Sequence, residues 1–157
     1  MTCVARVYDV LDPIRLLAIR DTPLSVDEVF RAVGDDAAGG TALFVGTVRD
    51  HDRDGNGGES GEAEVTGLSY SAHPTAEAVL RRVAEKVAAG FPIRAMAAVH
   101  RVGELTVGEL AVVVAVSCPH RDEAFAACRL LIDDLKREVP IWKHQTFSDG
   151  TQSWPGA

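Results

Sequence analysis

Apolar and polar residues recur along the chain with two different periods, and each period predicts a type of element. Short apolar runs rich in β-branched residues predict strands at 15–20, 41–48, 65–71, 93–99, 110–116 and 141–147. Apolar residues at helical spacing predict helices after Ser25, over 76–89 and over 121–138. The run at 110–116 is apolar throughout, which favours a central strand covered on both faces.

The ends of the helices have recognisable boundaries. The capping-box pattern at 25–28 starts the first helix, Pro74 and Gly90 bracket the second, and Pro140 stops the third. The apolar positions on each helix predict the faces that pack on the core: Val26, Val29, Phe30 and Val33; Val79, Leu80, Val83 and Val87; Phe125, Cys128, Leu131, Ile132 and Leu135.

The order of these elements predicts the fold class. Strands and helices are mixed without regular alternation, which favours an α+β fold with a mainly antiparallel sheet and packed helices. A chain of 157 residues is long enough for one domain with a substantial core, so we expect a single domain over 1–157.

The stretch 50–64 is rich in Asp, Gly and Glu and predicts a mobile surface loop. Asp50, Asp52, Asp54 and Gly55 match the opening of an EF-hand calcium loop. The match fails at its twelfth position, where Gly61 replaces the bidentate Glu, and the flanks predict strands instead of helices. A solvated loop is therefore the main interpretation, with a calcium-responsive protein as the weaker alternative.

Composition narrows the classes of partner and compartment. A net charge of −7 and a pI near 5.1 argue against nucleic acid or an anionic membrane as the main partner. Three cysteines without C-x-x-C spacing indicate a reducing compartment, and no signal peptide or 18-residue apolar run is present, so we expect a cytoplasmic protein. The histidines lack the spacing of metal ligands, so we predict no metal.

Five cationic side chains stand out against this acidic background and predict an anion-binding site: Arg49, His120, Arg121, Lys136 and Lys143. Pro140 is expected to turn the chain so that Lys143 returns toward Lys136. A lysine among other cations has a lowered pKa and can serve as an acid, a base or a nucleophile. The alternatives stay open: Lys136 can simply complement the helix dipole, and His120 can be a surface cap.

Four short motifs in this order resemble a known family: F-x-G-x-V-R at 44–49, H-R-V-G-E-L at 100–105, H-R-x-x-A-F at 120–125 and L-K-x-x-x-P-I-W-K at 135–143. Together they resemble the catalytic large subunit of molybdopterin synthase, the MoaE family, over residues 24–154. The resemblance implies an α/β-hammerhead fold and a sulfurtransferase of molybdenum cofactor biosynthesis that needs no cofactor of its own.

The resemblance also implies partners. A small ubiquitin-like subunit, of the MoaD type, carries a C-terminal Gly-Gly thiocarboxylate and delivers two sulfurs to cyclic pyranopterin monophosphate, forming the molybdopterin dithiolene. Two large subunits form a central homodimer with one small subunit at each end, which gives a heterotetramer.

By the resemblance, the catalytic residues are Lys136 and Lys143. The residues expected to bind substrate are these two lysines with Thr47, Val48, Arg49, His120, Arg121, His144 and Gln145. The chain departs from the family at Ser71 and His73, where a Glu and an aromatic residue are frequent, and at Gln145, where Glu is common. The Gln145 departure motivates an alternative function, a non-catalytic anion-binding or scaffold subunit that binds the small partner without turnover.

Overall fold

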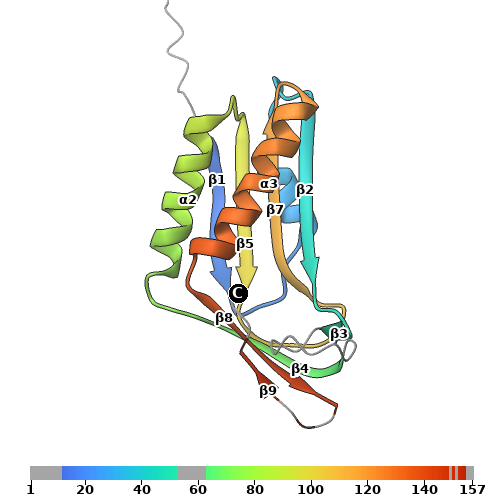
Figure 1. Ribbon diagram of the computed structural model, residues 1–157. Coiled ribbons are helices and arrows are strands. Elements are labelled where there is room, and N and C mark those ends of the chain that lie inside the picture. The colour runs from blue at the N-terminus through green and yellow to red at the C-terminus, as the bar shows by residue number, and fades with distance from the viewer. Residues whose placement is uncertain (1–11, 53–62, 149, 151, 155–157) are drawn as a thin grey trace, which may run out of the picture.

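The computed structural model describes residues 12–52, 63–148, 150 and 152–154, and its centre is a four-stranded sheet. Helices α2 and α3 cover one face of this sheet and α1 covers the other (Figure 1). The strand order is β1 (Ile14–Arg20), β5 (Ala95–Arg101), β7 (Leu110–Cys118), β2 (Gly40–Thr47). The helices are α1 (Val26–Ala32), α2 (Ala76–Gly90) and α3 (Arg121–Glu138).

The central position of β7 explains its unbroken apolar run. Alternate residues of a strand point to opposite faces, so Val112, Val114 and Val116 pack toward α2 and α3. Val113 and Ala115 pack toward α1 on the other face. Because both faces of the strand are covered, both sets of side chains are apolar.

A second sheet lies below the end of the first in the view of Figure 1. Its order is β3-β4-β8-β9, with β6 paired to the other edge of β4. The strands are β3 (His51–Asp52), β4 (Ala63–Ala72), β6 (Gly103–Leu105), β8 (Ile141–Phe147) and β9 (Gln152–Ser153). Side chains of β4, β6 and β8 join the core beneath α2 and α3, so this sheet closes one end of the core.

The α+β prediction is confirmed, and among the paired strands of the described ranges β1 with β5 is the one parallel pair. All three helices and all six predicted strands are present, although β5 starts at Ala95 instead of 93. The Ile93 N–H bonds to the Phe91 carbonyl at 2.8 Å, so that segment is still a turn. Strands β3, β6 and β9 have two or three residues each, too few for a readable pattern. Most of the predicted loop, including Asp54, Gly55 and Gly61, lies outside the described residues.

Two predictions of buried side chains are wrong. Phe125 is 66% exposed and Phe30 is 53% exposed. The buried face of α3 is centred on small and aliphatic residues: Ala124, Ala127, Cys128, Leu131, Ile132 and Leu135. Phe125 follows Ala124 by 100° of helical rotation, which turns its ring off that face. Helix α1 has seven residues and buries Val29, with Val33 at its end, so Phe30 faces outward.

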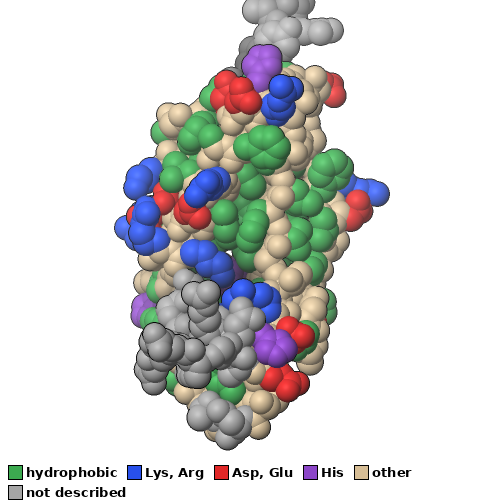
Figure 2. Space-filling model, turned by 45° about the vertical axis from the view of Figure 1, so that its right-hand side comes forward, with side chains coloured by type: hydrophobic (Ala, Val, Ile, Leu, Met, Phe, Trp, Pro, Cys, Tyr) green, Lys and Arg blue, Asp and Glu red, His purple; other side chains and the backbone are tan. Residues whose placement is uncertain are grey.

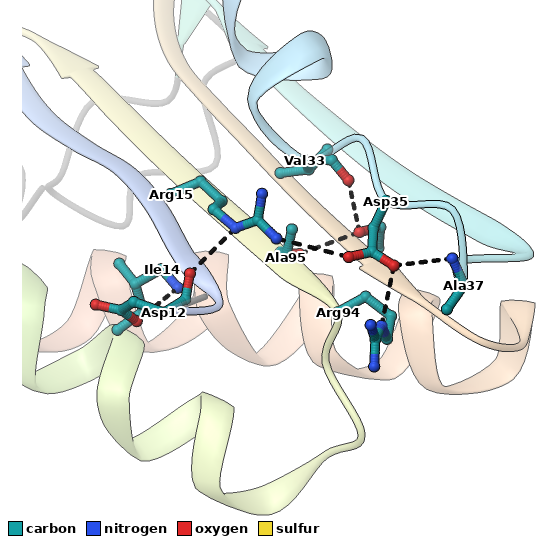
Figure 3. Close-up of polar contacts among 9 residues, drawn as sticks. Asp12, Ile14, Arg15, Val33, Asp35, Ala37, Arg94 and Ala95 are labelled. Carbon is teal, nitrogen blue, oxygen red and sulfur yellow. Dashed lines mark hydrogen bonds and ion pairs between the residues drawn. The ribbon is translucent and has the colours of Figure 1, made fainter. Parts of the chain in front are cut away.

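The end of the sheet where β1 and β5 begin is held by a charged group that we call the Asp35 cluster (Asp35, Arg15 and Arg94; Figure 3). The Asp35 carboxylate accepts from Arg94 Nε at 3.0 Å and from the Ala37 N–H at 2.9 Å, and it lies 3.6 Å from Arg15. These contacts lower the pKa of Asp35, with the Ala37 N–H as the largest cause and Arg94 next. The cluster therefore ties the segment after α1 to the starts of two strands.

Candidate functional site

The two predicted lysines come from consecutive elements. Lys136 lies in the last turn of α3, and Lys143 is the third residue of β8. Val139 caps the helix by donating its N–H to the Leu135 carbonyl at 3.1 Å, and Pro140 follows. The chain therefore reverses within three residues and runs back beneath the helix end.

Strand alternation decides which residues of β8 share a face with Lys143. Ile141, Gln145 and Phe147 are buried, whereas Trp142 between them is 46% exposed. Lys143 has the same parity as the buried set, so its side chain starts from the inner face of the sheet. Its cross-strand partner is Tyr70 of β4, which is buried. Lys143 and Tyr70 therefore extend from the same face.

The Lys136 side chain reaches the same place from above. Its Nζ lies 6.0 Å from the centroid of the Tyr70 ring. Burial lowers the pKa of Lys136, and the positive charge of Lys143 lowers it further. The predicted approach of the two lysines is therefore confirmed, while their catalytic roles stay predictions.

A buried histidine that was not among the predicted site residues completes this group. His100 of β5 is 1% exposed, and its ring stands edge-on to Tyr70 with 5.0 Å between centroids. Burial lowers the pKa of His100 to about 4, opposed by the bond to the Arg101 carbonyl and reinforced by the charge of Lys136. We call Lys136, Lys143, Tyr70 and His100 the lysine cluster.

The end of β2 lies at the same end of the sheet as the lysine cluster. Thr47 pairs with Leu110, two residues along β7 from the partner of His100. Val48 is buried and is held by backbone hydrogen bonds to Glu109 and Gly108. Arg49 follows with an exposed side chain. The structure thus brings Thr47, Val48 and Arg49 to the end of the sheet that carries the lysines.

His120 and Arg121 lie at the opposite end of α3. Fifteen residues separate Arg121 from Lys136, about 22 Å along a helix at 1.5 Å per residue. The position of Arg121 is tightly set, because a Cβ on Gly39 would lie 2.4 Å from the Pro119 carbonyl oxygen, and one on Gly40 would lie 3.0 Å from Arg121 Cα. Within one chain, His120 and Arg121 are not brought together with the lysines.

His144 and Gln145 are adjacent in sequence and lie on opposite faces of β8. The His144 ring packs on Trp154 with 4.2 Å between centroids, and its Nε2 lies 3.2 Å from the Gln152 amide oxygen. Gln145 is 2% exposed and shares the inner face with Lys143. The structure therefore associates Gln145 with the lysines and separates His144 from them.

The other departures from the family pattern lie away from the lysine cluster. Ser71 is exposed and pairs with Trp142 on the outer face of the second sheet. His73 is exposed after the end of β4, with its ring 6.2 Å from that of Trp142. Among the three departures, Gln145 alone shares a face with a predicted catalytic residue.

The face over α3 and β2 gathers exposed apolar side chains between the two sets of cations. Figure 2 shows hydrophobic side chains across the middle of this face, with Lys and Arg side chains above and below them. Phe44 of β2 and Phe125 of α3 are exposed apolar residues on this side, since Phe44 pairs with Val114, which packs toward α3. Exposed apolar surface of this kind is typical of a protein interface.

Other classes of site find little support in the part of the chain that the structure describes. No group of three or more His, Cys, Asp or Glu residues there is arranged to hold a metal ion. Cys118 and Cys128 are buried, and burial raises the pKa of Cys128 to about 11, which disfavours a reactive thiolate. None of the described helices is long and apolar enough to cross a membrane.

Comparison with known proteins gives a consistent result. A family model described as MoaE protein matches residues 19–138. The molybdopterin synthase catalytic subunit 1 of Mycobacterium tuberculosis is 45% identical over 143 residues, covering 88% of each chain. The crystal structure of molybdopterin synthase from Staphylococcus aureus superposes with a TM-score of 0.76 at 28% identity, covering 88% of this chain and 96% of that one. A complex of subunits 1 and 2 of molybdopterin-converting factor from Helicobacter pylori contains a chain with the same fold, with a TM-score of 0.65 at 20% identity and coverage of 88% of each chain.

Proposed function

The chain belongs to the MoaE family, and from that membership we propose that it is the catalytic subunit of a molybdopterin synthase, an enzyme of molybdenum cofactor biosynthesis. We further propose that it is a sulfurtransferase and that it works in the cytoplasm, where buried free thiols such as Cys118 and Cys128 stay reduced. The donor is the thiocarboxylated C-terminus of a small MoaD-type subunit, and the acceptor is cyclic pyranopterin monophosphate.

The observation that carries this proposal is a pair of lysines with one of them largely buried. An ammonium group in such a place binds the anionic tail of the donor and the phosphate of the acceptor. Because burial and Lys143 lower the pKa of Lys136, its amine gives up a proton more readily than an exposed lysine does. Transfer of sulfur from an anionic donor to an anionic acceptor requires both anion binding and an available proton, and the lysine pair can supply both.

The proposed chemistry balances without an external oxidant. The thiocarboxylate sulfur attacks a pterin carbon that carries oxygen, so a C–S bond forms and the C–O bond breaks. A lysine protonates the leaving oxygen, and the donor tail is then joined to the acceptor as a thioester. Water cleaves the bond between the carbonyl carbon and sulfur, which releases the tail as a carboxylate and leaves the sulfur on the product. A second donor adds sulfur to the neighbouring carbon in the same way, and loss of water across the two carbons leaves the carbon–carbon double bond of the dithiolene.

The position of His120 and Arg121 bears on how the subunit assembles. A separation of about 22 Å along α3 is too long for one small substrate to contact both this pair and the lysines. We propose that two copies pack in opposite directions across the exposed apolar face that includes Phe44 and Phe125. His120 and Arg121 of one copy then lie beside the lysines of the other, and each site in the homodimer is shared.

The function is tested by alanine variants of the lysines. Lys136→Ala and Lys143→Ala are each mixed with thiocarboxylated small subunit and pyranopterin substrate, and dithiolene formation is measured. We expect losses of about 100-fold or more for each, the range of a lost acid–base group. Lys86→Ala is the control, since Lys86 is exposed on α2 and outside the site. Near-normal product from both site variants would refute the assignment.

The same assay distinguishes the enzyme from a scaffold subunit. A non-catalytic module would bind the small partner and yield no dithiolene even as the wild-type chain. The observation that favours this second function is the buried Gln145 on the same face as Lys143, at a position where Glu is common in the family.

A mixing experiment tests the shared site. Lys136→Ala and Arg121→Ala homodimers are each expected to be inactive, and each mixed dimer should regain up to half of the activity of a wild-type dimer, because one of its two sites then receives both intact residues. Absence of recovery, with dimer exchange verified by mass, would place all the functional residues within one chain.

A further inference from the structure

The side chain of His100 lies on the functional face of the central sheet. Met96 and Ala98, which precede it by four and two residues on β5, pack on the side covered by α2 and α3. By strand alternation His100 points to the same side. It stands at the end of the sheet where α3 finishes and where the second sheet closes the core.

One nitrogen of this ring has a partner and the other does not. Nδ1 lies 2.7 Å from the Arg101 carbonyl oxygen, so Nδ1 carries the proton and donates it. Nε2 is consequently an acceptor. It is buried and has no hydrogen-bond partner within the described residues. A buried acceptor without a donor is costly, and such an atom calls for a functional explanation.

The groups around His100 restrict which donor can satisfy it. On the neighbouring strands its register partners are apolar, Ile19 of β1 and Val112 of β7. From β4 comes the Tyr70 ring, and from α3 comes Lys136, whose charge is close enough to disfavour a charged His100. Lys143 reaches the same cluster from β8 and interacts with Lys136.

The charged neighbour in the chain, Arg101, belongs to a different environment. It follows His100 by one residue, so it points to the opposite face, and it is paired with Glu109. His100 Nε2 lacks a hydrogen-bond donor, and Lys136 can supply one, because its flexible ammonium group carries three protons.

We propose that His100 is a positioning residue for Lys136, and that the Lys136 ammonium group donates a hydrogen bond to His100 Nε2 in the free chain in solution as well as during turnover. The structure has the two groups in one cluster without that bond, so rotation about the Lys136 side-chain torsions completes it. The proposal rests on the proposed function only in its expectation for the pH–rate profile. Its physical content is that His100 stabilises the protonated form of Lys136 against the effects of burial and of Lys143.

Three substitutions separate the acceptor from the other roles of the ring. His100→Phe keeps a ring against Tyr70 and loses the acceptor. His100→Asn keeps a donor for the Arg101 carbonyl and does not reach the Nε2 position. His100→Gln is long enough to return an acceptor oxygen near that position. Ring packing alone would spare the Phe variant, whereas a purely structural bond to Arg101 would spare the Asn variant.

The test measures the pKa of Lys136 directly, by the pH dependence of trace acetylation with acetic anhydride, quantified for each lysine by mass spectrometry on the full chain. We expect the Lys136 pKa to fall by about one unit in both His100→Phe and His100→Asn, since the ammonium form loses a hydrogen bond. In His100→Gln the Lys136 pKa should lie closer to the wild-type value, with a fall of no more than about half of that seen in the other two variants. Lys86, exposed on α2, is the internal control and should not move.

An unchanged Lys136 pKa in the acceptor-lacking variants overturns the proposal. If His100→Phe fails to fold, the Asn variant decides alone. Labelling needs neither substrate nor small subunit, so a chain that proves inactive in dithiolene formation still reports on His100. With activity present, the pH–rate profile of the same variants should shift in the same direction as the labelling curve.

Discussion

The two ends of the central sheet carry charged groups of different kinds, one in which opposite charges are paired and one in which like charges lie close together. At the end where β5 begins, the Asp35 cluster sets one carboxylate between two arginines and a backbone N–H. At the end where β5 finishes, the lysine cluster sets two ammonium groups around a tyrosine and a neutral histidine. The first matches opposite charges, and the second holds like charges together over a buried, unpartnered nitrogen.

The pKa shifts of the two clusters show what this difference does. Hydrogen-bond donors lower the pKa of Asp35, so its charged form is favoured by folding. Burial and a like charge lower the pKa of Lys136, so its charged form is disfavoured by folding. The Asp35 cluster therefore stabilises the fold, whereas the lysine cluster costs stability. Such a cost at one site is typical of a functional site.

The largest effect is expected from removing Lys136, whose partly buried charge lowers the stability of the fold. Lys136→Met keeps an unbranched chain of similar length and deletes the charge. We expect dithiolene formation to fall by about 100-fold or more. We expect thermal stability at pH 7 to rise, because a partly buried ammonium and its repulsion by Lys143 are both gone. The measurements are the product rate and the unfolding midpoint of the same preparation.

The pH dependence of that gain gives an independent check. The folded-state pKa of Lys136 lies below its ordinary value of about 10.4, so over the interval between the two the unfolded chain binds more protons. Wild-type stability relative to Lys136→Met should therefore rise with pH across this interval. A variant less stable than wild type at pH 7 would mean that Lys136 supports the fold, and the contrast with Asp35 would fail.

A smaller effect is expected from restoring the carboxylate that the family commonly carries beside Lys143. Gln145→Glu places a negative charge on the inner face of β8, two residues from Lys143. An opposite charge favours the ammonium form, so the pH–rate profile should move to higher pH by about one unit. Thermal stability should fall, since Gln145 is buried and a buried carboxylate is costly.

A neighbouring position provides the matched control for this charge. Thr146→Glu introduces the same side chain one residue further along β8, on the other face of the strand. It should leave the pH–rate profile unchanged. Equal shifts from both variants would show that the charge acts over the whole end of the molecule and not through the inner face.

The sequence predicts the fold more fully than the site, and particular residues show why. Periodicity reports burial within one element, so β7 and the inner face of α3 are readable from apolar spacing alone. Phe125 and Phe30 were misplaced because each lies beside the apolar stripe, and their exposure depends on which neighbouring element is present. Phe125 stays exposed because β2 is the edge strand of the sheet and no further strand of the described ranges follows it there.

Site residues are harder to predict because they meet through the fold. The motif at 135–143 contains both lysines, and a proline turn is enough to predict their approach. His100 falls just outside the predicted strand at 93–99, although it directly follows the apolar run of β5, and a histidine at the end of a buried strand is the signal that was available. Its contact with Tyr70 joins residues 30 apart, which spacing does not reveal. The opposite faces of His144 and Gln145 follow from alternation and were predictable.

The smallest effect is expected at the Asp35 cluster, where one substitution removes the negative charge and keeps a side chain of nearly the same shape. Asp35→Asn keeps an oxygen for the Ala37 N–H and removes the charge that faces Arg94 and Arg15. Catalysis should be unaffected, because the cluster lies at the opposite end of the sheet from the lysines. The unfolding midpoint at pH 7 should fall modestly, since exposed ion pairs contribute little.

The pH dependence identifies the cause of that fall. Because the folded-state pKa of Asp35 is lowered, its contribution is fully present above the ordinary aspartate pKa of about 3.9 and is lost as pH falls through the lowered value. Unfolding curves of wild type and Asp35→Asn should therefore differ at pH 7 and converge in acid. A difference that persists below the lowered pKa would assign the loss to altered packing. Convergence at low pH, with the Lys136→Met difference changing only in alkali, would mean that the two ends of one sheet respond to pH through opposite charges.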